Sequence, residues 1–290
     1  MIEKPRWFDL RESDTFRSIR KLVLCELATI SERNLEGLTD SEIASQLPGN
    51  PPDLRLRLDV VLSLESLLVQ LLKECELGPF GSLQFPANIR VLNPLQRRAS
   101  REEYSTEHLH CDAWSSAPSD SWNHLLYILA EPQCARLEMR ETLPTDHALR
   151  EYVGPYDKDL ANQITDLREV PIPCHPGVFV TWPTYTPHRT KYGSDWVADG
   201  SGRGPYRISL DFRTRIGHPY LEDRSSPLRD FAATKMNSGG VYWAFPDSEF
   251  LSFSHKVAFE NAFASRLSSE VLEKRSEYLR AHYRERISND

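Results

Sequence analysis

The chain has 290 residues, a mass of 33.4 kDa and a formal net charge of -7 at pH 7. With 40% hydrophobic and 27% charged residues, its composition is that of an ordinary globular protein and gives no sign of disorder. Lysine and arginine are scattered among acidic residues and form no stripe that could neutralise a run of phosphates, so nucleic acid is not expected as a substrate. A chain of this length can be an enzyme by itself, and we expect a single domain.

The amino terminus lacks the apolar core of a signal peptide, and no apolar stretch approaches membrane-spanning length. The five cysteines are Cys25, Cys75, Cys111, Cys134 and Cys174. They are an odd number, lie far apart and include no CxxC pair, which argues against a disulfide framework or a thiolate zinc site. We therefore expect a cytoplasmic protein that is not associated with a membrane.

Residues 13–76 show the period of amphipathic helices, because apolar side chains recur at intervals of three and four. The clearest are Leu22, Leu24, Leu27, Ile30, Val60, Val61, Leu64, Leu67, Leu68 and Leu71. The segment from Leu38 to Ile43 offers a capping residue before a short helix. This region predicts several helices that pack against a sheet.

After the turn at residues 78–81 the period becomes that of strands. Four segments are predicted as strands: residues 88–92, 123–129, 177–182 and 207–213. No helices alternate with these strands, so a sandwich or jelly roll is favoured over a parallel α/β sheet. Residues 254–286 return to a helical pattern.

The expected fold is mainly β with helical flanks, namely a double-stranded β-helix (jelly roll, cupin-like) with N-terminal and C-terminal helices. Within the single domain of residues 1–290, we expect a helical region at 1–80, the jelly-roll core at 81–220 and a largely helical extension at 221–290.

The segment most informative for chemistry is His110-Cys111-Asp112, which His188 follows much later in the sequence. In extended backbone, residues i and i+2 point to the same side, so His110 and Asp112 can face one metal ion, and a histidine from a distant strand can complete a triangular face. Two histidines and one carboxylate suit ferrous iron and leave three octahedral positions open. We predict that these three residues bind Fe(II) and form the catalytic centre.

A second polar group follows on the predicted strand at 207–213. Its alternate residues, Arg207, Ser209, Asp211 and Arg213, share one face. An arginine pairs bidentately with a carboxylate, so this face is a candidate anchor for the distal carboxylate of 2-oxoglutarate.

The order of HxD, distal histidine and RxS resembles the iron- and 2-oxoglutarate-dependent oxygenases, including the phytanoyl-CoA dioxygenase-like branch. Residues 112–114 with Pro118, followed by residues 122–124, resemble the oxygenases of aminoglycoside biosynthesis of the streptomycin and kanamycin type. The likeness covers roughly residues 85–215. It implies that Asn123 lines the cosubstrate site and that Arg207 and Ser209 bind 2-oxoglutarate.

One departure from the family pattern concerns the cosubstrate arginine. Arg207 follows His188 at a longer interval than is usual in the family, because residues 193–205 look like an inserted loop. The choice between Arg207 and Arg213 as the anchor therefore stays open.

The resemblance implies an oxidative reaction in which 2-oxoglutarate and O2 are consumed, succinate forms and a substrate C–H bond is oxidised. Because Asp112 stands where halogenating relatives have a small residue, hydroxylation, desaturation, ring closure or ketone formation is expected. The expected substrate is a small natural product of antibiotic or other secondary metabolism, such as an amino sugar, aminocyclitol or amino-acid derivative. Monomer and homodimer stay open.

Other candidates have plainer interpretations. We expect His108 to have a supporting or surface role, and Cys111 to point away from the metal. Four further histidines are expected to be ordinary polar residues: His124, His147, His175 and His218. Four aromatic residues are either core or substrate pocket: Trp114, Trp122, Trp182 and Tyr185. The loop at 193–204 is either disordered or a lid, and its Asp195 and Asp199 would suit a cationic substrate.

Two other functions are compatible with the same pattern. One is a cupin-like metal enzyme that does not use 2-oxoglutarate. The other is a jelly-roll binding module without catalytic activity, in which the histidines are incidental.

Overall fold

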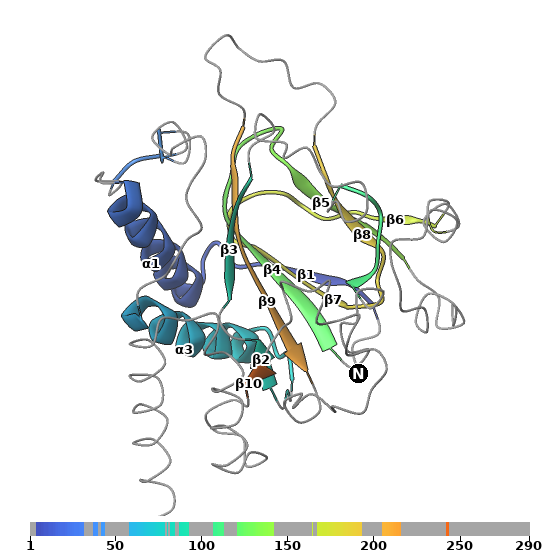
Figure 1. Ribbon diagram of the computed structural model, residues 1–290, viewed down its shortest axis with the longest axis horizontal. Coiled ribbons are helices and arrows are strands. Elements are labelled where there is room, and N and C mark those ends of the chain that lie inside the picture. Colours follow the sequence, from blue (N-terminus) through green and yellow to red (C-terminus); the bar gives the residue numbers. More distant parts are fainter. Residues whose placement is uncertain are drawn as a thin grey trace, which may run out of the picture.

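Two antiparallel sheets lie face to face in the computed structural model, and two helices cover the outer side of the larger sheet (Figure 1). The structure describes residues 4–31, 37–39, 42–43, 58–78, 80, 82–84, 87–92, 107–112, 121–141, 164, 167–192, 205–215 and 242–243. Among these residues, no helix has the length and apolar character needed to span a membrane.

The larger sheet has seven strands in the order β1-β7-β4-β9-β2-β10, and β3 also pairs with β9. These strands are β1 (Arg6–Asp9), β2 (Ser82–Gln84), β3 (Asn88–Leu92), β4 (Ser121–Ala130), β7 (Val178–Pro183), β9 (Arg207–Arg215) and β10 (Tyr242–Trp243). The central strand β4 pairs with β7 on one side and β9 on the other, so that segments far apart in the sequence lie side by side. This is the crossed antiparallel connectivity of a jelly roll.

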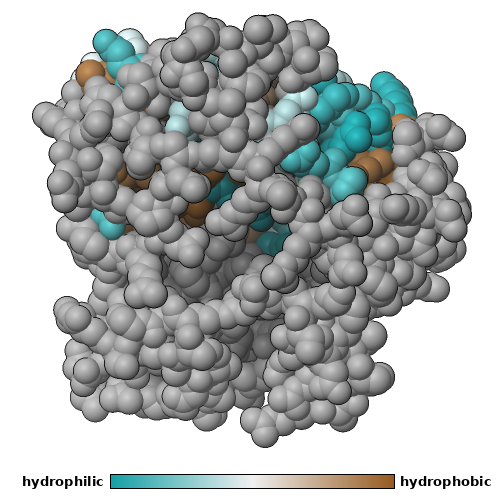
Figure 2. Space-filling view, turned by 45° about the horizontal axis from the view of Figure 1, so that its top comes forward, coloured by the Kyte–Doolittle hydropathy of each residue, from teal (hydrophilic) through white to brown (hydrophobic). Residues whose placement is uncertain are grey.

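The smaller sheet has three strands in the order β6-β5-β8, namely β5 (Arg136–Arg140), β6 (Glu169–Val170) and β8 (His188–Lys191). Leu137 and Met139 of β5 point towards the larger sheet, whereas Glu138 between them lies on the opposite face. There Glu138 pairs with Arg140, Arg189 and Lys191 at 2.7–2.8 Å. Figure 2 shows a hydrophilic surface over this sheet.

The central strand β4 is buried along nearly its whole length because both of its faces are covered. Its residues Leu125 and Tyr127 face the smaller sheet and join a compact cluster with Val178, Val180 and Trp182 of β7. Alternate residues, such as Leu126, face the helices. The interior between the sheets is therefore a separate compartment from the helix-packed core.

Helices α1 (Asp14–Ser31) and α3 (Leu58–Glu74) close the core on the other side. Ser13 caps α1, because its Oγ accepts a hydrogen bond from the amide of Phe16. The hydroxyls of Ser13 and Thr15 both donate to the carboxylate of Glu74, which joins the start of α1 to the end of α3. Thr39 and Glu42 form a reciprocal capping contact, in the segment where the sequence predicts a capping residue.

The jelly-roll fold class predicted from the sequence is confirmed, as are the four predicted strands, with β4 and β9 longer than expected. Six strands were not predicted: β1, β2, β5, β6, β8 and β10. Strand β1 lies within the amino-terminal region that we expected to be helical, and it pairs with β7. The predicted helix at 254–286 and loop at 193–204 lie outside the described residues, and the three-part division of the chain stays a prediction.

Candidate metal centre

His110 and His188 are brought together by the backbone. They form an antiparallel bridge in which the amide of His110 donates to the carbonyl of His188 at 3.1 Å and the reverse bond is 2.8 Å. The two imidazole centroids are 4.6 Å apart. Because His188 begins β8 of the smaller sheet, the bridge attaches the HxD segment to the rim of that sheet.

The orientation of both imidazole rings is fixed by backbone carbonyls. Nδ1 of His110 lies 2.7 Å from the carbonyl of His108, and Nδ1 of His188 lies 2.9 Å from the carbonyl of Thr186. A carbonyl only accepts hydrogen bonds, so each Nδ1 carries the proton. In the neutral form of each imidazole, Nε2 then presents the lone pair with which histidine binds a metal ion.

Asp112 supplies the third donor atom. Its Oδ1 lies 3.6 Å from Nε2 of His110 and 3.8 Å from Nε2 of His188. Two atoms that each lie about 2.1 Å from one ion are at most about 4.2 Å apart, so both distances fit a shared ion. All three donor atoms lie within 4.8 Å of one another. The sequence-predicted triad therefore converges, and its donor set fits a divalent metal ion such as Fe(II).

The charges of these groups also suit a cation. Burial opposes the ionisation of Asp112, but the guanidinium of Arg213 and the two imidazoles outweigh it and hold the pKa of this carboxyl well below its usual range. Burial lowers the pKa of His188 to about 4. Near neutral pH the site thus holds a carboxylate and, at His188, a neutral imidazole.

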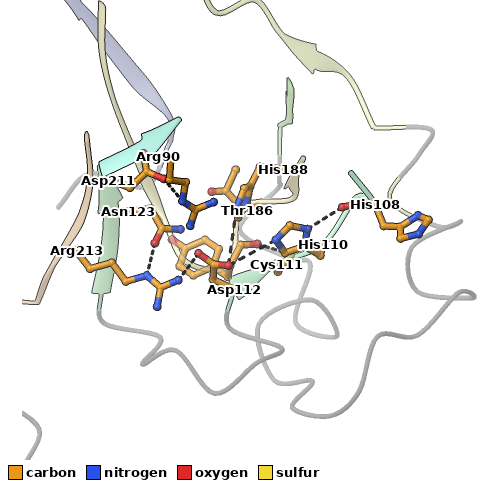
Figure 3. A network of polar contacts seen from close by, with 11 residues as sticks. Arg90, His108, His110, Cys111, Asp112, Asn123, Thr186, His188, Asp211 and Arg213 are labelled. Carbon is orange, nitrogen blue, oxygen red and sulfur yellow. Dashed lines mark hydrogen bonds and ion pairs between the residues drawn. The ribbon is translucent and has the colours of Figure 1, made fainter. Parts of the chain in front are cut away.

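Arg213 holds the carboxylate of Asp112 in its orientation (Figure 3). Its Nη2 donates to Oδ2 of Asp112 at 2.7 Å, and its Nε donates to Oδ1 of Asn123 at 2.7 Å. Asn123 and Arg213 are direct neighbours across the β4–β9 ladder. Because Oδ2 is engaged by Arg213, Asp112 presents a single oxygen, Oδ1, towards the histidines.

Arg207 lies farther along the same strand and is fully buried, with 1% of its surface exposed. Its Nη1 donates to the carbonyl of Ala135 at 3.2 Å, and its guanidinium carbon lies 5.8 Å from the centre of the Tyr127 ring. Its Nε and the hydroxyl of Ser209 are both buried and have no hydrogen-bond partner among the residues described. The two candidate arginines thus have different surroundings, and only Arg213 touches the triad.

Asp211 lies between these arginines on the inner face of β9. Its Oδ2 is 2.6 Å from Nε of Arg90, whereas its Oδ1 is buried without a hydrogen-bond partner in the described part of the chain. Figure 3 shows this ion pair next to Asn123. The space between the sheets therefore contains a hydrogen-bond acceptor, Asp211 Oδ1, and two donors, Arg207 Nε and Ser209 Oγ, that have no described partner.

Three further candidates, His108, Cys111 and His124, lie among the described residues. The side chain of His108 is exposed, and only its carbonyl contributes, as described above. The Sγ of Cys111 donates to the carbonyl of Tyr185 at 3.2 Å, which agrees with a structural role. His124 is buried on the helix side of β4, 2.7 Å from the hydroxyl of Thr214.

The aromatic candidates divide between the two sides of the larger sheet. Trp122 packs against Phe80 in the helix-side core and is not a pocket residue. Trp182 lies on the inner face, with its ring centre 5.3 Å from that of His188. Trp114, His147, Asp195, Asp199 and His218 lie outside the described residues.

Sequence reasoning missed three supporting contributions to this site: the carbonyls of His108 and Thr186 and the contact between Arg213 and Asp112. Backbone carbonyls leave no signal in residue identities. The position of Arg213 on the same face as Arg207 was visible in the pattern, but its contact with Asp112 depends on the register of β9 against β4.

No protein-family model and no curated protein sequence matches this chain. Similar solved structures include AviO1 from Streptomyces viridochromogenes Tue57, which is 13% identical with a TM-score of 0.41 over 78% of this chain and 92% of that chain. SnoK, a non-heme alpha ketoglutarate dependent carbocyclase from nogalamycin biosynthesis, is 12% identical with a TM-score of 0.44 over 79% of this chain and 86% of that chain.

EctD from S. alaskensis with bound Fe is 14% identical with a TM-score of 0.43, and the similarity covers 82% of each chain. These values describe a general likeness of fold, and the metal centre rests on its own geometry. The structures to which this chain is similar thus include enzymes of the iron- and 2-oxoglutarate-dependent type that the sequence resembles.

Proposed function

We propose that this protein is an Fe(II)- and 2-oxoglutarate-dependent oxygenase that oxidises a small organic molecule. The observation that carries the proposal is the convergence of His110, Asp112 and His188 with three single donor atoms aimed at one point. This set of two imidazoles and one carboxylate is the facial triad typical of non-haem iron oxygenases.

When bound, the ferrous ion would supply the chemistry that couples decarboxylation of 2-oxoglutarate and consumption of O2 to oxidation of the substrate. The protein's own contribution is to hold the donors. The carbonyls of His108 and Thr186 fix the two imidazoles, and Arg213 fixes the carboxylate. Such supporting contacts maintain both the orientation and the basicity of metal ligands.

We assign the distal carboxylate of 2-oxoglutarate to Arg207 and Ser209, and not to Arg213. Arg213 is already paired with Asp112 and Asn123. Arg207 is a buried cation that makes no ion pair with a described acidic residue, and its Nε and the Ser209 hydroxyl are unused donors on one strand face. A buried charge is costly without a counter-ion, and a carboxylate would satisfy all of these groups.

We propose that Asn123 contacts the cosubstrate nearer the metal. Its Oδ1 is bound by Arg213, whereas its Nδ2 is buried and has no partner among the residues described. A side-chain amide donor in that position can hydrogen-bond a carboxylate oxygen. Asn123 and Ser209 would then lie on one inner face, between the metal centre and Arg207.

For the substrate, we propose a small natural product of secondary metabolism, such as an amino sugar, an aminocyclitol or an amino-acid derivative. The unused Oδ1 of Asp211 favours a substrate that carries hydroxyl or ammonium donors. The net charge of -7 is compatible with a cationic ligand. Hydroxylation, desaturation, ring closure and ketone formation are all compatible with these residues.

The test separates the roles of the two arginines. Anaerobic addition of 2-oxoglutarate to the ferrous protein should give a visible charge-transfer band. Arg207→Met should retain iron binding and lose the band at 2-oxoglutarate concentrations that saturate the wild type. Arg213→Met should weaken iron binding itself by roughly 10–100-fold, the usual effect of losing a group that supports a metal ligand.

Arg20→Met is the matched control, because Arg20 also donates to a backbone carbonyl but lies on the helix side of the sheet. It should change neither iron affinity nor the band. Absence of the band in folded, iron-loaded wild type would favour a cupin-like metal enzyme without 2-oxoglutarate. Absence of iron binding would favour a non-catalytic binding module. An Arg207→Met protein with unchanged 2-oxoglutarate affinity would contradict the assignment of that arginine.

A further inference from the structure

Two cysteines that are distant in the sequence meet beside the far end of the inner compartment. Cys134 lies just before β5, and Cys174 lies in the segment that leads to β7. Their Sγ atoms are 3.6 Å apart, and both thiols are free. A disulfide bond is about 2.05 Å long, so a small movement of either side chain joins the sulfurs.

The pair lies next to Arg207, the buried cation described above. Arg207 donates to the carbonyl of Ala135, the residue that directly follows Cys134. The hydrogen bond from Cys134 and the charge of Arg207 outweigh burial and lower the pKa of the Cys174 thiol. The same shared hydrogen bond raises the pKa of Cys134. Cys174 is therefore the more acidic of the two thiols, and Cys134 the less acidic.

The two sulfurs also differ in access. Cys174 is partly exposed, whereas Cys134 is 4% exposed. Oxidants attack the thiolate and not the thiol, and they attack accessible sulfur first. The arrangement is that of an attacking thiolate with a resolving thiol held beside it.

We propose that Cys134 and Cys174 form a redox-active pair that closes into a disulfide when a peroxide oxidises Cys174, and that this changes the charge next to Arg207. In the first step the Cys174 thiolate displaces hydroxide from hydrogen peroxide and becomes a sulfenic acid. In the second, the Cys134 thiol attacks that sulfur, the S–S bond forms and water leaves. The peroxide is reduced by two electrons and the two thiols are oxidised by two.

Closure of the disulfide has a consequence for cosubstrate binding, which rests on the function proposed above. A thiolate at Cys174 and the distal carboxylate of 2-oxoglutarate would both be anions beside Arg207 and would compete for it. Removal of the thiolate should therefore tighten 2-oxoglutarate binding, and by linkage 2-oxoglutarate should slow the alkylation of Cys174 in the reduced protein. A coupling at the low end of the usual range gives roughly a fivefold change in affinity.

The first experiment locates the disulfide. The full-length protein, kept with a chelator so that iron plays no part, is treated with hydrogen peroxide, and its unreduced peptides are identified by mass spectrometry. We expect a cross-link between Cys134 and Cys174 that is absent in Cys174→Ser and in Cys134→Ala. It should persist in Cys75→Ser, because Cys75 is a buried thiol whose pKa is raised to about 12 by burial. Oxidation of Cys174 to sulfinic acid with Cys134 still free, or no oxidation of Cys174, would overturn the proposal.

The second experiment tests the link to Arg207. After removal of peroxide and chelator, ferrous iron is added anaerobically to the oxidised and reduced proteins, and 2-oxoglutarate affinity is read from the charge-transfer band. Tighter binding to the disulfide form supports the link, and equal affinities overturn it. If neither form shows a band, the cosubstrate proposal fails, while the cross-link is still judged by the peptide data.

Discussion

Each histidine of the metal centre is oriented by a carbonyl just before it in the chain. His110 bonds to His108 and His188 bonds to Thr186, although the two segments are distant in the sequence. The same local contact, used twice, leaves both Nε2 atoms free. The third ligand is oriented differently, by the long-range ion pair of Asp112 with Arg213. Two ligands are thus oriented locally, and the third depends on the correct register of β9.

His124 shows how differently a histidine behaves away from the metal centre. Its ring lies beside those of Phe179 and Phe212, with centroids 5.7 and 4.7 Å away, and burial lowers its pKa to about 3. In the unfolded chain this imidazole takes up a proton near pH 6.5. Between about pH 6.5 and 3 the unfolded state therefore binds more protons, and stability falls as the pH falls.

We predict that His124 contributes up to about 1.4 kcal/mol of lost stability per pH unit across this window. Urea unfolding of the metal-free protein from pH 7.5 to 4.5 measures the slope. His124→Phe removes the titrating group and keeps an aromatic ring packed beside Phe179 and Phe212, so its slope should be shallower by that amount. Equal slopes for the two proteins would show that His124 is protonated in the folded state.

The sequence was sufficient to predict which three side chains lie together in the His-Asp-His cluster, but not what surrounds each arginine. HxD spacing and the distal histidine are local signals that any extended backbone converts into a shared face. Arg207 and Arg213 lie on the same face of one strand, and the sequence pattern treats them alike. Their different surroundings follow from the pairing of Arg213 with Asn123 and of Arg207 with Ala130, which only the folded sheet determines.

Among the elements, the strands that were missed differ in how visible they were. The β5 segment Arg136–Arg140 alternates charged and apolar residues, which is a strand signal that could have been used. The β8 segment His188–Lys191 has no apolar residue and gives no such signal. It is a strand because it pairs with β5 and because Arg189 and Lys191 bind the buried Glu138. Its existence is therefore a tertiary effect.

The turn before β7 is a point where three segments meet. Gly177 has a φ of 85°, its amide donates to the carbonyl of Tyr127, and its carbonyl accepts from the amide of Leu10. A Cβ at this position would lie 2.9–3.1 Å from the side chain and backbone of Arg11. Both the positive φ and the close packing require glycine here.

We predict that Gly177→Ala destabilises the protein by about 2–4 kcal/mol, the sum of left-handed backbone strain and overpacking. Gly37→Ala is the matched control, because Gly37 also has a positive φ of 76° but has no atom within 4 Å of an added Cβ. It should cost only about 1 kcal/mol. Chemical unfolding of both variants measures the difference in the free energy of unfolding. Equal decreases in the two variants would mean that Arg11 moves away from the added Cβ at little cost.

For the molecule as a whole, the two faces of the larger sheet differ in the side chains that they bury. The helix side is filled by apolar residues of α1, α3, β4 and β9. The inner side combines an apolar cluster with polar atoms that have no described partner, among them Arg207 Nε, Ser209 Oγ and Asp211 Oδ1. Stability is thus concentrated on one side, and the other side can keep polar groups available for ligands.

The three candidate metal ligands join parts of the fold that are otherwise distant. His188 begins β8 of the smaller sheet, His110 and Asp112 lie in a separate segment, and Arg213 connects Asp112 to β9 of the larger sheet. An ion bound by these residues therefore links both sheets. Because the unfolded chain does not hold the three donors together, metal binding should stabilise the whole domain.

We predict that Mn(II), which replaces Fe(II) without being readily oxidised, stabilises the protein by about 2.7 kcal/mol at a concentration one hundred times its Kd. For a chain of this size the shift in Tm is roughly 4 °C, measurable by calorimetry. His188→Ala should abolish the shift. His175→Ala should keep it, because His175 bonds to the carbonyl of Pro176 and is not one of the three ligands. An equal shift in wild type and His188→Ala would place the stabilising ion elsewhere, since removing one of three protein donors must weaken a site built from all three.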